Sequence, residues 1–232
     1  MSTATSTRPL GPAEPAPPTR RFDYVADGPA IYDDSFATIR AEADLSVVPA
    51  NAEKVAVRMI HGSGQTDLVH DLVVHPALGD AGRAALADGA PVLCDVRMVA
   101  MGVTASRLPA GNAVHCLLTE PEVPLLASAW GTTRTAAAVS LWEPYLEGAV
   151  VAIGNAPTAL FHLLEMLLDG APRPAAIIGC PVGFIGAAES KQALVDLAGE
   201  HGIDVPFVTV RGRRGGSAMA CSAVNALATE VE

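Results

Sequence analysis

The sequence predicts a doubly wound α/β fold, in which helices cover both faces of a mostly parallel sheet. Three observations lead to this prediction. From about residue 91 onward, short apolar runs recur along the chain, stretches with helical periodicity lie between them, and glycine-rich segments mark several of the junctions. Strands buried on both faces have this uniformly apolar character. Half of the 232 residues are hydrophobic and 17% are charged, so we expect one main domain with a sizeable core.

The part of the chain before these runs is expected to contain a tail and two helices. Residues 1–21 carry five prolines among serine, threonine and alanine, which predicts a disordered tail ahead of a domain spanning residues 22–232. Pro29 suits the first turn of one amphipathic helix. A second amphipathic helix is expected to begin near Asn51 and to include Ile60.

The remaining elements follow from the alternation of apolar runs and helical periodicity. Leucines and other apolar side chains at helical spacing predict helices at 157–168 and 217–228. Because a strand, a helix and the next parallel strand connect with a right-handed crossover, the pattern builds an open sheet with helices on both faces. Strands are expected at residues 91–96, 113–118, 149–153, 175–178 and 206–210.

Composition and charge argue against several functions. A net charge of -10 leaves no excess of lysine and arginine to replace the counterions around phosphates, so we expect no nucleic-acid partner. The four cysteines lie far apart without histidines at ligand spacing, so neither a metal site nor a disulfide framework is predicted. The longest uncharged run, 174–188, contains Pro181 and is shorter than the roughly 20 residues that span a bilayer. We therefore expect no membrane partner and a cytoplasmic protein.

Three glycine-rich loops are candidates for binding an anionic ligand. They lie at 153–158, 178–183 and 210–217, where strands are expected to end and, in two cases, a predicted helix to begin. Ligands of open α/β sheets bind at this edge, and helix N-termini there present free N–H groups. The third loop also carries Arg211, Arg213 and Arg214. The alternative is that the glycines of each loop merely turn the chain between strand and helix.

Neither of two nucleotide-binding patterns is present. The chain has no G-x-x-x-x-G-K-[ST] loop, and no G-x-G-x-x-G follows a predicted strand with an acidic residue roughly 20 positions later. Carboxylates therefore compete with phosphates as the anion that the loops would bind. A nucleotide-binding regulatory α/β domain remains one alternative function, although it lacks both patterns.

From Phe22 to its C-terminus, the chain resembles the precorrin-8X methylmutase family. The similar stretches include Val57-Arg-Met-Ile-His61 and Val210-Arg-Gly-Arg-Arg-Gly-Gly-Ser-Ala-Met219, and the others lie at 31–44, 108–112 and 152–161. The resemblance implies a homodimeric isomerase that moves a methyl group from C-11 to C-12 of precorrin-8X in cobalamin biosynthesis. The product is hydrogenobyrinic acid or its cobalt counterpart, and no added cofactor is implied. A corrin precursor carries carboxylates around a flat apolar ring, which suits an anion-binding site.

His61 matches the catalytic histidine of the family. The rearrangement needs a proton moved to or from the macrocycle, and an imidazole with a pKa of about 6.5 can give or take one near neutrality. Arg58 lies three positions earlier and is expected on the same helical face. Without the resemblance, His61 reads as a surface or hydrogen-bonded core residue. The other histidines keep that reading: His70, His75, His115, His162 and His201.

Further substrate contacts are implied by the resemblance and by the loops. The family pattern places contacts at Tyr32 and Ser35, three apart on the first helix, and at Thr104 and Arg134. Each has a plainer interpretation, because Tyr32 and Ser35 can pack or cap and Arg134 follows two threonines that can cap a helix. The full set of expected substrate-binding residues is Tyr32, Ser35, Arg58, Thr104, Arg134, Asn155, Arg213 and Arg214.

The chain departs from the family pattern at four positions near the expected site. After His61 the family usually has alanine or threonine and then cysteine, whereas this chain has Gly62 and Ser63, which predicts a looser loop beside the histidine. Arg97 and Met101 stand where the family has glutamate and histidine. These departures keep open a second function, a corrinoid-binding or carrier protein that retains the pocket without the chemistry.

Overall fold

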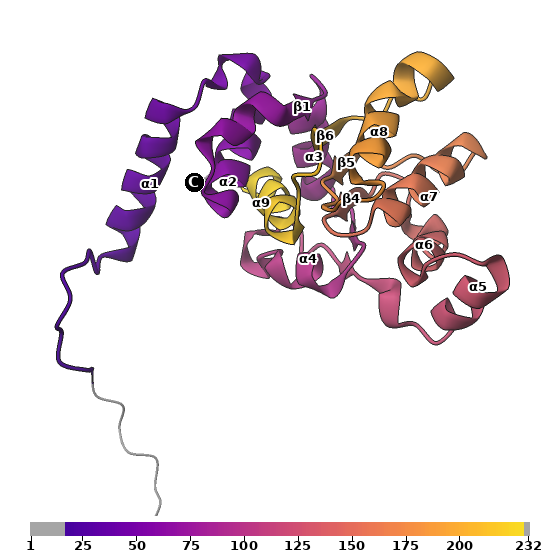
Figure 1. The fold of residues 1–232 in the computed structure, drawn as a ribbon, viewed down its shortest axis with the longest axis horizontal. Coiled ribbons are helices and arrows are strands. Elements are labelled where there is room, and N and C mark those ends of the chain that lie inside the picture. The colour runs from indigo at the N-terminus through magenta and orange to yellow at the C-terminus, as the bar shows by residue number, and fades with distance from the viewer. Residues whose placement is uncertain (1–16, 230–232) are drawn as a thin grey trace, which may run out of the picture.

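A six-stranded sheet lies between two layers of helices in the computed structural model, which describes residues 17–229 (Figure 1). Its strand order is β1-β6-β5-β4-β2-β3, and every neighbouring pair is parallel except β1 with β6. The predicted doubly wound α/β fold is therefore confirmed. The strands are β1 (Leu72–Val74), β2 (Val92–Cys94), β3 (Val114–His115), β4 (Val150–Ile153), β5 (Ala176–Gly179) and β6 (Phe207–Val210).

Each of the five predicted strands is present, although most are shorter than expected. The strand missing from the prediction is β1, which pairs antiparallel with β6 and places Leu72 opposite Val210. It was missed because only three apolar residues lie between polar neighbours and the Pro76 that follows. This edge strand begins beside Val210, at the carboxyl end of β6, and carries the chain away from the region of His61 towards the start of β6.

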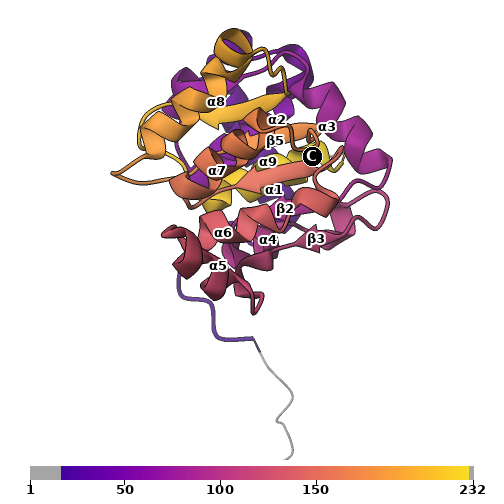
Figure 2. The same cartoon turned by 90° about the vertical axis from the view of Figure 1, so that its right-hand side faces the viewer.

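Helices cover both faces of the sheet (Figure 2). Alternate residues of the strands point to opposite faces. In β4, Val150 and Ala152 join the core under one layer, whereas Val151 and Ile153 join the core under the other. The first layer holds α1 (Gly28–Glu42), α2 (Glu53–Ser63), α3 (Leu78–Ala87), α4 (Arg97–Gly102) and α9 (Ser217–Leu227). The second holds α6 (Arg134–Ser140), α7 (Pro157–Leu168) and α8 (Ala187–His201), with α5 (Val123–Trp130) packed on α6.

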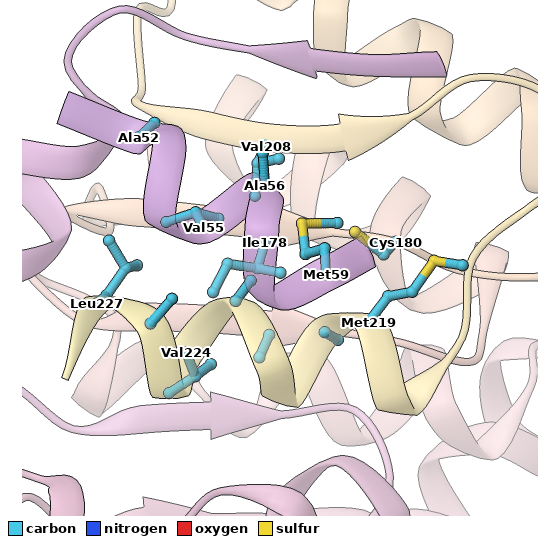
Figure 3. Packing of buried hydrophobic residues seen from close by; sticks show 14 of the residues in the cluster. Ala52, Val55, Ala56, Met59, Ile178, Cys180, Val208, Met219, Val224 and Leu227 are labelled. Carbon is cyan, nitrogen blue, oxygen red and sulfur yellow. The ribbon is translucent and has the colours of Figure 1, made fainter. Parts of the chain in front are cut away.

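The packing of α2 against α9 places the last turn of α2 at the carboxyl edge of the parallel strands. Figure 3 shows the two helices side by side above the sheet, with α2 running in the direction of β6. Val55, Ala56 and Met59 of α2 are each at most 1% exposed and pack over β5 and β6. A Cβ added at Gly62 of α2 would lie 3.4 Å from the backbone oxygen of Ala218 on α9, so the two helices approach closely at this end. The side chains that follow Met59 therefore emerge where ligands of this fold class bind.

The N-terminal helix α1 packs on α2 from the outside (Figure 1). Its buried residues are Phe36 and Ile39, and Asp27 caps its first turn by accepting the N–H of Ala30 at 3.2 Å. Residues 17–27 precede it without helix or strand and are exposed. Most of the tail predicted at residues 1–21 lies outside the described residues. Within 17–229, no helix is long and apolar enough to cross a membrane.

A close approach between α3 and the turn that precedes α2 leads to the first prediction. A Cβ on Gly79 would lie 2.0 Å from the backbone oxygen of Asn51, so Gly79→Ala should lower the free energy of unfolding by about 1–3 kcal/mol through overpacking. Urea denaturation measures this. Gly199→Ala is the matched control, because Gly199 is an exposed helical glycine of α8 with no described atom within 4 Å of such a Cβ. It should raise stability by up to about 1 kcal/mol, and equal effects of the two substitutions would contradict the packing.

Candidate active site

His61 lies in the last turn of α2, and that turn is fixed rather than loose. The helix continues through Gly62 and Ser63, and Gly64 ends it with a φ of 67°, in the left-handed conformation that glycine adopts most readily. The N–H of Gly64 donates to the carbonyl of Ile60 at 2.8 Å. The predicted loosening of the chain after His61 is therefore wrong, because the two altered residues are helical.

The glycine at position 62 has a packing reason. A Cβ at Gly62 would lie 2.5 Å from the Oγ of Ser222 and 3.4 Å from the backbone oxygen of Ala218, both on α9. With Ser222 in this orientation, the family's alanine or threonine would not fit. Glycine at position 62 therefore leaves room for Ser222 of the neighbouring helix. Its lack of a side chain lets the end of α2 pack against the first turns of α9.

Two aromatic rings of α1 flank the imidazole of His61. The ring centroids of Tyr32 and Phe36 lie 5.4 Å and 5.0 Å from that of His61, and the two rings meet edge to face. Arg58 approaches the same rings, with its Cζ 5.1 Å from the centroid of Phe36 and 5.8 Å from that of Tyr32. Arg58 and His61 therefore share one face of α2, as their spacing predicts. The structure brings together Tyr32, Arg58 and His61.

Arg58 is a buried cation whose hydrogen-bonding capacity is largely unused. The residue is 4% exposed, and its Nε and Nη2 atoms have no hydrogen-bond partner among the described residues. Removing a cation from water costs several kcal/mol unless an anion and hydrogen-bond acceptors replace the water. Cation–π interactions with the two aromatic rings stabilise the guanidinium by only about 0.5–2 kcal/mol. An unsatisfied guanidinium beside His61 is therefore suited to receive a carboxylate.

Tyr32 joins this basic group through Arg107, a residue that sequence analysis missed. The guanidinium of Arg107 beside the phenol, supported by Arg58, lowers the pKa of Tyr32, although partial burial acts in the opposite direction. Arg107 ends the short helical turn that starts at Ala105, and it belongs to no glycine-rich loop. In the sequence, only its position three residues after Thr104, an expected substrate contact, could have indicated that Arg107 belongs to the site.

Hollows lie on both sides of α1. A cleft of about 480 Å³ is lined by Ser35, Ile60 and His61 among others, and it is open to solvent. A second hollow of about 380 Å³ is lined by Tyr32, Phe36 and Arg107. Ser35 itself donates its hydroxyl to the carbonyl of Ile31 at 2.7 Å, so its oxygen still has lone pairs to offer a ligand. Tyr32 and Ser35, the two expected substrate contacts of α1, thus line different hollows, one on each side of the helix.

Thr104 lies near this region, whereas Arg134 does not. The N–H of Thr104 donates to Oδ1 of Asn225 on α9 at 2.8 Å, and the amide of Asn225 also donates to Gly102. Thr104 is therefore fastened beside the helix that supports His61. Arg134 begins α6, where Thr133 caps the helix, and α6 packs on α5 and α7 in the layer opposite α2. Figures 1 and 2 show α6 and α1 on opposite sides of the molecule.

Three backbone N–H groups of the loop at 153–158 are already used within the protein. Asp95, at the end of β2, accepts the N–H groups of Gly154, Asn155 and Ala156 at 2.9–3.0 Å. Asp95 is 2% exposed, and burial raises the pKa of its carboxyl while these N–H groups act to lower it. The expectation that the backbone of this loop binds a substrate carboxylate is therefore corrected: a carboxylate of the protein occupies it. The exposed side chain of Asn155 remains a candidate contact.

The two arginines of the third loop differ in their surroundings. Arg213 is exposed and stacks over Phe184, with its Cζ 5.2 Å from the ring centroid. Arg214 donates to Asp67 at 3.0 Å, to Asp71 at 2.8 Å and also to Gln65. These hydrogen bonds raise the pKa of Arg214 and lower that of Asp67. Arg213 can still meet a ligand, whereas the guanidinium of Arg214 is already paired.

Comparisons with known proteins show the family to which the chain belongs. A family model described as precorrin-8X methylmutase matches residues 30–230. The chain belongs to the precorrin-8X methylmutase family. It is 64% identical to the precorrin-8X methylmutase of Pseudomonas aeruginosa over 91% of this chain and all of the relative, and 58% identical to that of a Sinorhizobium species over 89% of this chain and 97% of the relative. The resemblance stated from the sequence is confirmed.

A solved structure and a more distant relative extend the comparison. The precorrin-8X methylmutase structure from Thermus thermophilus superposes with a TM-score of 0.77 at 38% identity, covering 87% of this chain and 95% of that one. A cobalt-precorrin-8 methylmutase of Leptospira interrogans is 32% identical over 86% of this chain and 92% of the relative. Membership of the precorrin-8X methylmutase family makes this chain an isomerase.

The unpaired charge of Arg58 leads to the second prediction. Replacing it by methionine, which fills similar space without charge, should raise the free energy of unfolding of the ligand-free protein by about 1 kcal/mol or more, because a buried cation no longer lacks an anion. Urea denaturation measures the change. Arg97→Met removes an exposed arginine from α4 and should alter stability by less than about 0.5 kcal/mol. A clear loss of stability in Arg58→Met would show that Arg58 is satisfied within the protein.

Proposed function

We propose that this chain converts precorrin-8X into hydrogenobyrinic acid, with His61 exchanging a proton with the macrocycle while the methyl group migrates from C-11 to C-12. One observation above all supports the proposal: an open imidazole lies beside a buried guanidinium that lacks an anion. The substrate supplies what the site lacks, since its carboxylates carry negative charge and its ring is flat and apolar.

In this proposal the residues around His61 have distinct tasks. Arg58 receives a carboxylate close to the reacting ring. Tyr32, whose phenol lies beside Arg107 and Arg58, donates a hydrogen bond to the same carboxylate. Ser35 contributes a hydroxyl from the other side of α1, and Thr104, Asn155 and Arg213 are candidate contacts for more distant carboxylates. Because these groups bind without reacting, their loss should raise KM more than it lowers kcat.

Replacing the imidazole tests the proton transfer. His61→Ala should fold and bind hydrogenobyrinic acid, while kcat for metal-free precorrin-8X falls by about 10²- to 10⁴-fold, the usual contribution of general acid or base catalysis. Anaerobic turnover is followed through the change in visible absorption, and the pH–rate profile should lose a limb near neutrality. His201→Ala, in the last turn of α8, is the matched control and should keep the parental rate. A similar rate for His61→Ala would exclude His61 from the chemistry.

A corrinoid-binding or carrier protein is the alternative function. Tight binding of precorrin-8X to the parental protein without any turnover would favour it. The helical geometry around Gly62 argues against this alternative, because the chain next to His61 is packed on α9 rather than loosened. The cytoplasmic location expected from the sequence stays a prediction.

We also propose a homodimer with its sites near the subunit boundary. Arg134 lies on the opposite side of one chain from His61, so a second copy is needed if both contact one substrate. The segment before α1 exposes large apolar side chains suited to burial, with Phe22 81% exposed and Tyr24 and Val25 each 59% exposed. Both observations fit a site completed across a twofold boundary.

Mixing two inactive variants tests the dimer directly. Light scattering should report a dimer at micromolar concentration. If Arg134 binds substrate in the partner's site, His61→Ala and Arg134→Ala should each be nearly inactive at substrate concentrations far below the KM of Arg134→Ala. At the same concentration, mixtures that have exchanged subunits should recover up to about a quarter of parental activity. Half of the dimers are then mixed, and each mixed dimer has one intact site. A monomer in solution would contradict the proposal, and a dimer without recovery would place Arg134 outside the partner's site.

A further inference from the structure

Arg214 holds two segments of the chain together at the carboxyl edge of the sheet. Its guanidinium makes paired contacts with Asp67, Nη1 to Oδ2 at 3.0 Å and Nη2 to Oδ1 at 3.2 Å, and Nη1 also donates to Asp71 at 2.8 Å. Gln65 accepts a further hydrogen bond from Nη2. The backbone adds another tie, because the N–H of Arg211 donates to the carbonyl of Asp71 at 2.7 Å. One side chain thus binds three residues within 65–71.

The segment 65–71 is the part of the chain that leaves the helix of His61. Gly64 ends α2, Gln65 follows directly, and β1 begins at Leu72. Between the cap of α2 and the pairing of β1 with β6, Arg214 contacts the segment near its start and at its end. Its hydrogen bonds therefore help to set the path of the chain four to ten residues after His61.

The backbone of Arg214 is anchored to the core of the protein. Its backbone oxygen accepts a hydrogen bond from the Nζ of Lys191, a residue that is 1% exposed. Burial lowers the pKa of this lysine. Two residues later the N–H of Gly216 donates to the carbonyl of Cys180 at 2.9 Å. The loop that carries Arg214 is thus fixed to β5 and α8, so the side chain projects from a rigid base.

We propose that Arg214 is a positioning residue for His61 and not a contact of the substrate. It aligns the last turn of α2 by holding segment 65–71 through Asp67 and Asp71. This inference rests on the proposed role of His61. It also replaces the expectation that Arg214 binds a carboxylate of the substrate, because two carboxylates of the protein already occupy its guanidinium.

The ion pairs that Arg214 makes with Asp67 and Asp71 form a network of partly exposed side chains. This network can therefore position the end of α2 without adding much to the stability of the protein. The exposed fractions are 28% for Arg214, 73% for Asp67 and 37% for Asp71. Ion pairs with this exposure contribute little to folding. A small misplacement of a reacting group, by contrast, can cost about a hundredfold in rate. Loss of the network should therefore reduce turnover without unfolding the protein.

Steady-state kinetics of variants on both sides of the network test the inference. Arg214→Gln should lower kcat about 10- to 100-fold and change KM less than twofold. The double variant Asp67→Asn with Asp71→Asn, which keeps Arg214, should cause a similar loss in kcat. Combining all three substitutions should add little, because each removes the same interaction. Arg214→Lys, which keeps the charge without the planar fork, should restore activity in part.

The opposite kinetic pattern would overturn the inference. If Arg214 binds the substrate, Arg214→Gln should raise KM, whereas freeing Arg214 from its carboxylates should lower KM. Asp204→Asn is the matched control. It removes the ion pair between His75 and Asp204, 3.0 Å long, at the other end of the paired strands β1 and β6. That variant should keep kcat and KM.

A measurement without substrate distinguishes this inference from the proposed function. The NMR signals of the His61 imidazole, assigned by comparison with His61→Ala, should shift in Arg214→Gln and in the double aspartate variant. They should not move in Asp204→Asn. Unchanged signals in the first two variants would refute the positioning role even if His61 is catalytic. Shifted signals together with full activity of His61→Ala would support the positioning role and reject the proposed chemistry.

Discussion

The contact between α2 and α9 is the interaction on which the rest of this structure depends. Both helices lie on the same face of the sheet and pack side by side there (Figure 3). At the carboxyl edge the approach is close enough for Gly62 to meet Ser222. A histidine one position earlier is therefore held at the edge where this fold class binds ligands. The site is a consequence of how two helices share a core.

The charges near that edge divide into those the protein has already neutralised and those it has not. Asp95 uses the N–H groups of one loop, and Arg214 is held by two aspartates. Arg58 differs, because it is buried among aromatic rings without an acceptor for two of its nitrogens. An incoming anion gains most where the protein has left a charge unpaired. The glycine-rich loops form part of the edge, but Arg58, the buried cation without an anion, lies between α1 and α2.

The sequence predicted the fold class, five strands and the shared helical face of Arg58 and His61 because these depend on local periodicity. It missed β1, whose three apolar residues define no pattern until β6 lies beside them. It also assigned free N–H groups to the loop after β4, because nothing along the chain shows that Asp95, some 60 residues earlier, reaches them. Arg107 was missed for the same reason. Spacing along one helix is visible in a sequence, whereas partners brought together by the sheet are not.

The attachment of α1 by two buried side chains has a consequence for motion. A helix of 15 residues that buries Phe36 and Ile39 against α2 has far less apolar contact to lose than α9, which carries seven buried residues. Elements with few buried contacts open locally at lower free energy than the core. Amide protons of α1 should therefore exchange with solvent well before those of α2 and α9. Tyr32 and Ser35 leave the imidazole of His61 whenever this helix detaches, so the candidate site can open while α2 stays folded.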